Sequence, residues 1–257
     1  MMTNYLEGKK AIVTGGSKGL GADIALALTR AGASVVILGR DLEGLKKTQA
    51  LIEQQGGSCF VVQADLQDTQ AIEEASKKTL ELSPSWDILV NNAGVSKALP
   101  LLETTAEDWD ELFRINVRAA FLLSKYIAPQ MIQRKSGKII NVSSLGTFYG
   151  TPGLGAYAAS KAGLNQLTKT MAVEWGGSNI QINAVCPTVI LTDMGKLIWD
   201  DPSRKEMREK IEKRIPLKRF AKPKEVSDLV VFLSGAGSDF MNGCIIPIDD
   251  GASLNPA

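Results

Sequence analysis

The chain has 257 residues, of which 44% are hydrophobic, 22% charged and 6% aromatic. Its 29 Lys and Arg residues nearly balance its 28 Asp and Glu residues, for a formal net charge of +1. This balance argues against a protein that holds nucleic acid or anionic lipid by bulk electrostatics. Histidine is absent, which excludes His-based zinc sites and every Ser-His-Asp or Cys-His mechanism. If the chain is an enzyme, another group must move its protons.

The cysteines and the N-terminus indicate the compartment. Cys59, Cys186 and Cys244 are odd in number and have no CxxC spacing, so we expect neither a disulfide framework nor a metal site. The N-terminus lacks the apolar stretch of a signal peptide, and no window approaches the ~20 apolar residues of a membrane span. We therefore expect a soluble cytoplasmic protein with no metal, no nucleic-acid partner and no membrane partner.

Short apolar runs rich in Val, Ile and Leu predict strands along the whole chain. They lie at residues 10–14, 34–38, 59–63, 87–90, 138–142, 180–185 and 244–248. Helical patterns separate them, at about 20–33, 41–55, 68–82, 105–134, 155–176 and 223–234. Buried strands that alternate with helices are typical of right-handed βαβ units. The predicted fold is a single α/β domain over residues 1–257, a doubly wound parallel sheet of about seven strands with helices on both faces.

Two segments depart from this regular alternation. Pro129 lies inside the long 105–134 pattern and is expected to bend or divide that helix. Residues 188–217 are rich in charge and separate the sixth strand from the next helix, which suggests either a substrate lid or a satellite helix pair. Their position at the carboxyl edge of the sheet favours the lid. Trp199 either anchors this lid over substrate or plugs its helices, and we favour the plug.

A glycine-rich turn follows the first strand. Residues 14–21 read Thr-Gly-Gly-Ser-Lys-Gly-Leu-Gly and lead into a helix. Backbone amides and the helix dipole at such a turn can face a pyrophosphate. The spacing GxxxGxG differs from the better-known GxGxxG fingerprint, and turns of this kind also occur without a ligand.

The end of the second strand indicates which dinucleotide is bound. Gly39 occupies the position where an acid that binds the ribose hydroxyls is expected, and Arg40 follows it. Lys18 in the glycine turn can reach the same corner. Two cations there favour a 2′-phosphate and hence NADP(H) over NAD(H). The alternative is that Arg40 is a solvated loop charge and Asp41 only caps the next helix.

A tyrosine and a lysine offer acid–base chemistry without histidine. Tyr157 and Lys161 are spaced i, i+4 at the start of a predicted helix, so they share one face. A free tyrosine has a pKa of about 10, but a neighbouring ammonium and an oxidised nicotinamide would lower it. Ser144 ends the fifth predicted strand, where it can donate a hydrogen bond to a substrate carbonyl. By itself, YxxxK on a helix is more often a surface pair.

The motifs taken together resemble the short-chain dehydrogenase/reductase family over essentially the whole chain. The residues that carry this resemblance are ordered and spaced as in the family, namely Thr14, Gly15, Gly19, Gly21, Asp65, Asn91, Asn92, Ala93, Gly94, Asn116, Ser144, Tyr157, Lys161, Pro187 and Thr192. The resemblance implies a Rossmann-type fold with seven parallel strands and an NAD(P) cofactor. Thr188 departs from the pattern, because many members have glycine after the proline.

The resemblance also implies roles for these residues. Tyr157 is expected to be the acid in reduction and the base in oxidation, and Ser144 to hold the substrate oxygen. Lys161 is expected to bind the nicotinamide ribose and lower the tyrosine pKa, and Asn116 to keep a water in a proton relay. With the glycine turn included, the expected cofactor contacts are Gly15, Ser17, Lys18, Gly19, Leu20, Gly21, Arg40, Asp65, Leu66, Asn92, Ala93, Gly94, Tyr157, Lys161, Pro187, Ile190 and Thr192.

Within the family, the lid is similar to the L-xylulose (dicarbonyl/diacetyl) reductase branch. Pro-Thr-Val at 187–189, Met-Gly at 194–195 and Trp-x-x-Pro at 199–202 carry this likeness, whereas the tail at 249–257 does not match. The branch implies NADPH-dependent reduction of small ketoses, polyol-related substrates or α-dicarbonyls, and a homotetramer. The expected partner is accordingly a small-molecule carbonyl or alcohol substrate.

Two other functions stay open. One is a 3-oxoacyl-thioester reductase or a reductase of bulkier hydrophobic ketones. A carrier-bound acyl chain would need a basic docking surface, for which Arg114, Arg118, Lys125 and Arg134 are candidates, although a solvated helix face explains them equally well. The other is a non-catalytic NADP-binding protein. Such proteins usually lose the Tyr or the Lys, and this chain keeps both.

Overall fold

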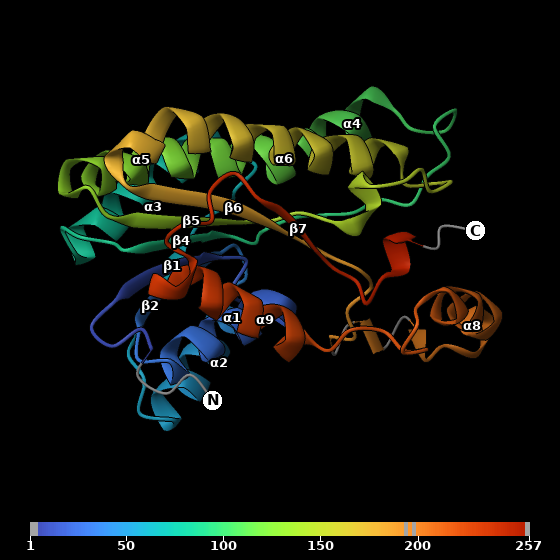
Figure 1. The fold of residues 1–257 in the computed structure, drawn as a ribbon, viewed down its shortest axis with the longest axis horizontal. Coiled ribbons are helices and arrows are strands. Elements are labelled where there is room, and N and C mark those ends of the chain that lie inside the picture. Colours follow the sequence, from blue (N-terminus) through green and yellow to red (C-terminus); the bar gives the residue numbers. More distant parts are fainter. Residues whose placement is uncertain (1–4, 193–194, 197–198, 255–257) are drawn as a thin grey trace.

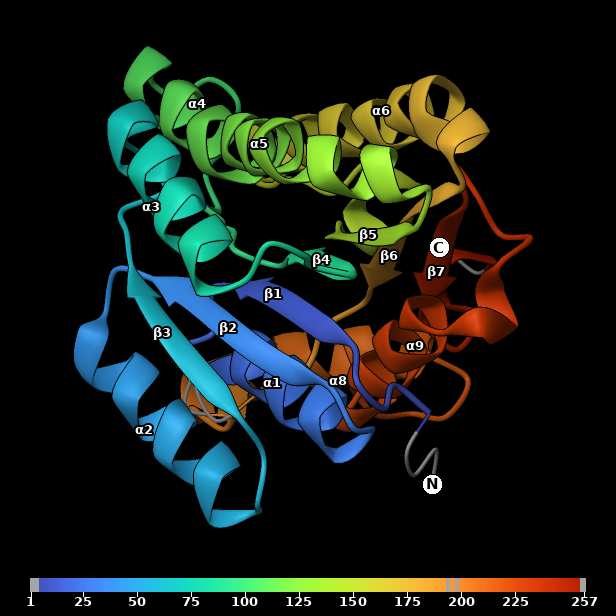
Figure 2. The ribbon, with the colours of Figure 1, turned by 90° about the vertical axis from the view of Figure 1, so that its left-hand side faces the viewer.

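A seven-stranded parallel sheet forms the centre of the computed structural model, which describes residues 5–192, 195–196 and 199–254. The strand order is β3-β2-β1-β4-β5-β6-β7 (Figures 1 and 2). The strands are β1 Lys10–Thr14, β2 Ser34–Gly39, β3 Cys59–Gln63, β4 Ile88–Asn91, β5 Gly137–Val142, β6 Ile180–Pro187 and β7 Ile245–Ile248. The expected doubly wound sheet is confirmed.

Helices cover both faces of the sheet (Figures 1 and 2). One layer contains α1 Gly19–Arg30, α2 Leu42–Gln54 and α9 Pro223–Ser234. The other contains α3 Thr69–Leu82, α4 Ala106–Phe113, α5 Ala119–Arg134 and α6 Gly155–Trp175. Within the described part of the chain, no helix is long and apolar enough to cross a membrane.

The central strands β1, β2, β4, β5 and β6 are almost entirely buried on both faces, whereas the edge strands β3 and β7 are partly exposed. Successive residues of a strand point to opposite sides, so Ile12 of β1 packs with α3, α5 and α6, whereas Ala11 and Val13 pack with α1 and α9. The neighbouring β2 repeats this alternation: Val36 packs on the same side of the sheet as Ile12, and Val35 and Ile37 pack on the opposite side. The central strands β1, β2, β4, β5 and β6 therefore each join two hydrophobic cores, as an almost unbroken Val/Ile run predicts.

The long helix predicted over 105–134 is interrupted, but not where we expected. Pro129 lies within the continuous helix α5 and does not divide it; that Pro129 bends the helix stays a prediction. The interruption is a π-helical turn at Arg114–Arg118, which separates α4 from α5 and contains Asn116. A π turn inserts one residue and leaves the helical spacing intact on either side of it, so a long helical pattern hides it.

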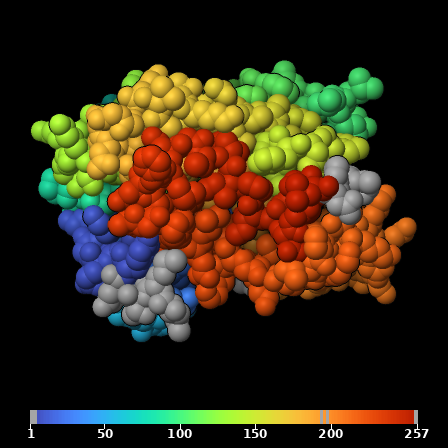
Figure 3. Space-filling model, viewed as in Figure 1, coloured from blue at the N-terminus to red at the C-terminus, as the bar shows by residue number. Residues whose placement is uncertain are grey.

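The charged segment after β6 forms a separate structure at one end of the molecule. It contains a 3-10 turn at Pro202–Arg204 and the helix α8 at Lys205–Arg214, which lies beside the red 3-10 turn at Ala252–Leu254 (Figures 1 and 3). Trp199 packs against Phe220 with ring centroids 5.1 Å apart in an edge-on arrangement. Trp199 thus packs in a small cluster around Phe220 and Ile215. Residues 193–194 and 197–198 of the predicted lid lie outside the described residues.

The order in which strands are added to the sheet reverses between β1 and β4. From β1 the chain proceeds to β2 and β3 on one side, and then returns to begin β4 on the other side. In sheets of this kind, ligands bind beyond the carboxyl ends of the strands at such a reversal. The glycine turn follows β1 and the Asn-Asn-Ala-Gly segment follows β4, so both predicted motifs meet at this point.

Candidate active site

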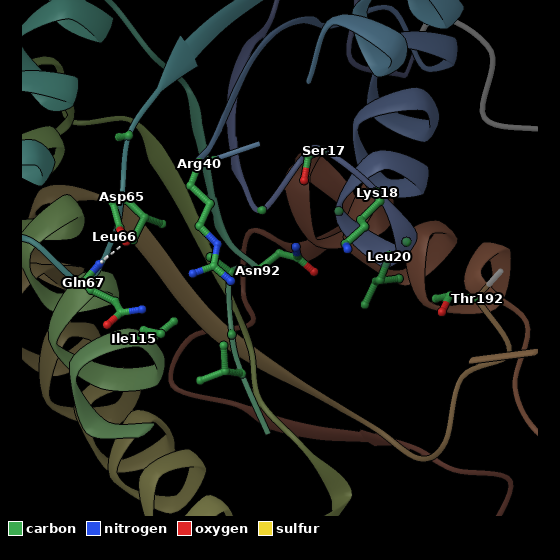
Figure 4. Close-up of a pocket in the computed structure, with 18 residues that line it drawn as sticks. Ser17, Lys18, Leu20, Arg40, Asp65, Leu66, Gln67, Asn92, Ile115 and Thr192 are labelled. Carbon is green, nitrogen blue, oxygen red and sulfur yellow. Dashed lines mark hydrogen bonds between the residues drawn. The ribbon is translucent and has the colours of Figure 1, made fainter. Parts of the chain in front are cut away.

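A cavity of about 340 Å³ lies at the reversal point, and we call it the glycine-loop cavity. Figure 4 shows its walls, which come from the carboxyl ends of β1 to β4. The residues lining it are Gly15, Ser17, Lys18, Gly19, Leu20, Gly21, Gly39, Arg40, Ala64, Asp65, Leu66, Gln67, Asn92, Ala93, Gly94, Val95, Ile115 and Thr192. The cavity therefore includes thirteen of the seventeen predicted cofactor contacts.

The glycines of the turn are required by close packing. A Cβ on Gly21 would lie 2.2 Å from the Gly15 carbonyl oxygen and 2.5 Å from Nδ2 of Asn92. Gly15 itself has φ of +69°, in the left-handed region that favours glycine. The Asn92 amide donates to the carbonyl of Thr14 at 2.8 Å. The turn and the end of β4 are thus held together, leaving an open cradle at the start of α1.

Two cations project into this cavity. Arg40 and Lys18 extend into it from different walls (Figure 4). Both are exposed, and no carboxylate of the described residues forms a salt bridge with either. Asp41 does cap α2, since its side chain accepts from the backbone N–H of Gly44 at 3.0 Å. The cap therefore accounts for Asp41 but gives Arg40 no partner.

The far wall of the cavity contains Asp65, which the sequence predicted, and Gln67 and Ile115, which it did not. Asp65 turns its carboxylate to the backbone N–H of Gln67 at 3.0 Å (Figure 4). Gln67 and Ile115 both line the cavity, but neither carries a motif. Gln67 follows β3 by four residues, and this position after a parallel strand is the signal that could have found it.

A second cavity of about 690 Å³ adjoins the first, and we call it the Tyr157 cavity. Leu20, Asn92, Gly94 and Val95 line both cavities. The predicted residues that line the second cavity are Ser144, Tyr157, Lys161, Pro187 and Ile190, together with three that it shares with the first, Leu20, Asn92 and Gly94. The predicted cofactor contacts and the predicted catalytic residues Ser144, Tyr157 and Lys161 therefore lie in one site, which consists of two adjoining cavities.

Tyr157 and Ser144 face this cavity from different elements. Tyr157 lies in the first turn of α6, and Ser144 follows β5. Burial raises the pKa of Tyr157, while a side-chain hydrogen bond with Ser144 acts in the opposite direction. The raised pKa is opposite to the lowering that we expected from Lys161. The reason is that, in the protein without its cofactor, desolvation of the phenolate outweighs the hydrogen bond with Ser144.

Lys161 is a buried cation, with only 4% of its surface exposed. Its ammonium donates to the carbonyl oxygen of Val142 at 2.8 Å. Burial lowers the pKa of Lys161 to about 8, because an apolar environment disfavours the charged form. The hydroxyl of Ser143 donates to the Lys161 carbonyl at 3.2 Å, so the strand end and the helix hold each other in place.

Asn116 lies behind the cavity wall rather than in it. The amide of Asn116 donates to the Val95 carbonyl and to the Ser160 hydroxyl, each at 2.9 Å. Its carbonyl oxygen accepts from the backbone N–H of Val95 at 2.9 Å. The side chain therefore supports the segment after β4 and the helix that carries Tyr157. Its role in a proton relay stays a prediction.

The remaining wall comes from the segment after β6. Val189, Trp199, Met207 and Ile211 supply an apolar surface, and Arg204 and Arg214 supply positive charge. Of these, sequence reasoning had weighed only Trp199 for substrate contact. Trp199 packs on Phe220, as expected of a plug, and it also lines the Tyr157 cavity, as expected of a lid residue that lies over substrate.

The residues present fit a nicotinamide dinucleotide. Its phosphates suit the cradle that admits no Cβ at Gly21 and the two cations, which have no carboxylate partner among the described residues. Its reactive ring suits the adjoining cavity, which holds a phenol and a buried ammonium. A Ser–Tyr–Lys group can hold and protonate an oxygen without imidazole. Fold and site together define a dinucleotide-dependent oxidoreductase.

Comparison with known proteins gives the same class. A family model described as "Enoyl-(Acyl carrier protein) reductase" matches residues 15–253. Gluconate 5-dehydrogenase of Gluconobacter oxydans is 36% identical over 250 residues, which cover 97% of this chain and 96% of the relative. L-xylulose reductase of Bos taurus is 40% identical over 251 residues, covering 96% and 97%. The chain belongs to the short-chain dehydrogenase/reductase family, whose members use NAD(P).

Two further comparisons bear on chemistry. The 3-oxoacyl-[acyl-carrier-protein] reductase FabG of Thermotoga maritima is 36% identical over 246 residues, which cover 96% of this chain and 98% of the relative. A solved structure from Beutenbergia cavernae, provisionally described as an NAD(P)-dependent gluconate 5-dehydrogenase, holds NADP at low occupancy. It has a TM-score of 0.91 and 33% identity, covering 98% of this chain and 99% of that one. The relatives thus include several different activities on one fold.

Proposed function

We propose that this protein is an NADPH-dependent reductase of the ketone group of a small substrate. The observation that carries the proposal is the continuity of the two cavities, with Arg40 and Lys18 in one and Ser144, Tyr157 and Lys161 in the other. NADPH supplies the hydride when it is bound. The protein's own residues supply the anchoring of the cofactor, the orientation of the carbonyl and the proton.

The acid–base roles follow from the chemistry of the three side chains. Ser144 holds the carbonyl oxygen by hydrogen bonding, and Tyr157 donates the proton that the oxygen takes up. Because burial raises the pKa of Tyr157, the phenol is protonated at neutral pH, which is the state needed for reduction. Lys161 is held by Val142 and binds the nicotinamide ribose. Asn116 supports the segment that carries Gly94 and Val95.

The preference for NADP(H) rests on charge at the adenosine end. Arg40 and Lys18 line one cavity and form no salt bridge with any carboxylate that the structure describes, and Gly39 stands where an acid would repel a 2′-phosphate. The solved relative with NADP supports this choice. The remaining predicted contacts complete the proposed cofactor site, with Asp65 and Leu66 beside the adenine, and Pro187, Ile190 and Thr192 beside the carboxamide.

The proposed substrates are small ketoses and their polyols, or α-dicarbonyls. L-xylulose reductase is among the relatives, and its name points to an uncharged sugar. Gluconate 5-dehydrogenase is another, and its name points to a sugar acid. The names of the relatives therefore support a polyhydroxylated substrate without deciding whether it carries a charge.

A 3-oxoacyl-thioester reductase is the second candidate, favoured by the FabG relative. The basic residues suggested for carrier docking are, however, mostly engaged within the chain. Arg118 donates to the Gln67 carbonyl, and Arg134 donates to the Trp86 carbonyl at 2.7 Å and pairs with Asp87. Arg114 pairs with Asp110 at 3.6 Å. This surface offers less free positive charge than the sequence suggests, which favours the small substrate.

The assignment is tested by following NADPH oxidation across a panel of ketoses, diacetyl, aromatic ketones and an acetoacetyl thioester. Turnover of ketoses or diacetyl with a preference for NADPH over NADH supports the proposal. A preference for the thioester would favour the second candidate. No turnover of any substrate, with NADPH still bound, would favour a non-catalytic NADP-binding protein.

We further propose one domain over 1–257, with residues 188–217 as its substrate lid, in a homotetramer in the cytoplasm. Large apolar side chains exposed on the surface support an oligomer, since Val173 is 85%, Leu254 87% and Phe240 105% exposed. The three cysteines are free, as suits a reducing compartment. Light scattering during gel filtration measures the oligomer directly.

A further inference from the structure

Helix α6 carries a third polar side chain on the side that holds Tyr157 and Lys161. Asn165 follows Lys161 by four residues, as Lys161 follows Tyr157, and this spacing places all three along one side of the helix. Asn165 is only 8% exposed, and it lines neither of the two cavities. A buried amide costs free energy unless it is hydrogen-bonded, so its partners indicate what it does.

Two successive hydrogen bonds join Asn165 to Ser144. The side-chain N–H group of Asn165 donates to the hydroxyl oxygen of Thr147 at 3.0 Å. That hydroxyl in turn donates to the backbone carbonyl of Ser144 at 2.9 Å. Ser144 precedes the 3-10 turn at Leu145–Thr147, and Thr147 ends it. The two bonds therefore fasten this turn to α6.

The turn also fixes the direction of the Ser144 hydroxyl. Its oxygen accepts from the backbone N–H of Gly146 at 3.1 Å. The backbone carbonyl of Ser144 accepts from the N–H of Thr147 at 3.2 Å, beside the bond from the Thr147 hydroxyl. Because the Gly146 N–H occupies one lone pair of the Ser144 oxygen, the hydroxyl proton is directed away from the turn. Ser144 lines the Tyr157 cavity, where this proton can be donated.

The other end of the Asn165 amide is held from β6. The thiol of Cys186 donates to the Asn165 carbonyl oxygen at 3.9 Å. Cys186 is completely buried, and burial raises the pKa of its thiol, so the thiol keeps its proton at neutral pH and stays a donor. With its oxygen turned to this thiol, the amide presents its N–H group to Thr147.

We infer that Asn165 is a positioning residue, which acts through Thr147 to direct the Ser144 hydroxyl at the oxygen that Tyr157 protonates. The inference rests on the proposed reductase function and adds a residue to its machinery. Helix α6 then controls both groups that contact the reacting oxygen, because it carries Tyr157 and holds Ser144 through Asn165. An apolar residue at position 165 would fill the same space but would let the Thr147 hydroxyl rotate.

Asn165→Leu tests the inference, because leucine has a similar shape without the amide. The assay is NADPH oxidation with the ketone of the substrate panel that wild type reduces fastest. We expect kcat to fall by about ten- to hundredfold, because the Ser144 donor is misaligned. KM and the Kd of NADPH are expected to change by less than about threefold. Thr147→Val is expected to give the same loss, and Thr147→Ser, which keeps the hydroxyl, to recover most of the activity.

A double variant separates positioning from damage to the fold. Ser144→Ala removes the hydroxyl that Asn165 is inferred to direct, so adding Asn165→Leu is expected to lower kcat by less than about a further twofold. If Asn165 only supported the fold, the two losses would multiply. The control is Thr168→Val, which removes another buried hydroxyl of α6, one that accepts from the Asn141 amide at 2.8 Å. We expect it to change kcat by less than about twofold, whatever its effect on Tm.

The pH profile of the reverse reaction gives an independent readout. Tyr157 is the proposed base in alcohol oxidation, and its hydrogen bond with Ser144 lowers the Tyr157 pKa. Loosening this bond raises that pKa, so in Asn165→Leu the rate of NADP⁺ reduction is expected to rise at a pH higher by about half a unit or more. Lys161 on α6 and Cys186 at the end of β6 are titratable neighbours of Tyr157 that wild type and variant both keep. Thr168→Val is expected to retain the wild-type profile.

Each outcome decides the inference. If Asn165→Leu reduces the ketone at the wild-type rate, the inference is wrong and the proposed function stands. If Asn165→Leu does not fold, Thr147→Val takes its place in the same assays, with the same result required. If the losses from Ser144→Ala and Asn165→Leu multiply, Asn165 is structural and the inference fails. If wild type reduces no carbonyl of the panel, the proposed function fails, and this inference fails with it.

Discussion

The two cavities of the site are built in different ways. The glycine-loop cavity is formed by the ends of four neighbouring strands, and the Asn92 side chain bonds one of them to the glycine turn. The Tyr157 cavity has one wall of this kind, where Ser144 follows β5, and Tyr157 reaches it from the first turn of α6. Its other wall is α8, which packs on a small cluster around Phe220.

This difference separates two tasks. Residues at strand ends are fixed by the sheet, so they suit contacts that must be the same for every substrate, namely those to the cofactor and the reacting carbonyl. A wall on a separate helix can change its side chains without disturbing the two main cores. We therefore expect substitutions in the first group to affect turnover or cofactor binding, and substitutions on α8 to affect substrate choice.

The largest expected effect is on proton transfer. Tyr157→Phe removes the proposed acid, and turnover is expected to fall by about a thousandfold or more, with NADPH affinity changed little. Fluorescence titration of NADPH alongside the rate measurement separates the two. Tyr126→Phe, whose hydroxyl contacts Glu73 at 3.4 Å outside the site, serves as the control. Unchanged turnover in Tyr157→Phe would refute the mechanism.

Lys161 makes stability depend on pH. Its pKa is lowered from 10.5 to about 8 by burial, so between these values the unfolded state binds more protons than the folded state. The free energy of unfolding is therefore expected to rise with pH across this window, by roughly 3 kcal/mol from this group.

Urea denaturation at about pH 7.5 and pH 10 measures this contribution. Lys161→Met is expected to lose the rise, whereas Lys169→Met, an exposed position on the same helix, is expected to retain it. The same pH dependence in wild type and Lys161→Met would contradict the assignment. Such a result would mean that Lys161 is not a buried cation.

The glycine turn tests the strand-end wall. Gly21→Ala would place a methyl group 2.2 Å from the Gly15 carbonyl oxygen, and overpacking of this kind costs about 1–3 kcal/mol. We expect weaker NADPH binding by about tenfold or more. Gly177→Ala is the matched control, since nothing lies within 4 Å of its Cβ. Equal NADPH affinity in the two variants would mean that the turn tolerates a side chain.

Arg40 tests the choice of cofactor, with the smallest expected effect because its charge is exposed. Arg40→Asp is expected to weaken NADPH binding by about tenfold or more, with NADH binding unchanged or improved. Lys47→Asp makes the same change of charge at an exposed position of α2 outside the cavity lining. A variant of Arg40 that still prefers NADPH would contradict the phosphate assignment.

The sequence predicted the fold well because its signals are local. The apolar runs at 10–14 and 59–63 are strands with the same bounds in the structure, and the helix at 223–234 has the same bounds too. The π turn at Arg114–Arg118 could not be seen, because it preserves the apolar spacing on either side. Pro129 was misleading for a related reason, since a helix can accommodate a proline when packing holds both its ends.

The candidate site was predictable where a residue type carries the chemistry. Tyr157, Lys161 and Ser144 are such residues. Gln67 and Ile115 were missed because only their position at the cavity wall distinguishes them. Arg214 was missed because a charged helix has many arginines and lysines, and which of them faces a cavity depends on tertiary packing. The sign of the Tyr157 pKa shift likewise depends on burial, which a motif does not report.

The wall that the two cavities share also has a kinetic consequence. Leu20, Asn92, Gly94 and Val95 line both cavities. The surface that they offer to substrate is therefore complete only when the cofactor fills the glycine-loop cavity. Under the proposed function, the order of addition is thus set by architecture: cofactor enters first and leaves last. Product-inhibition patterns should then show NADP⁺ competing with NADPH alone, while the alcohol product inhibits noncompetitively with respect to both NADPH and the ketone.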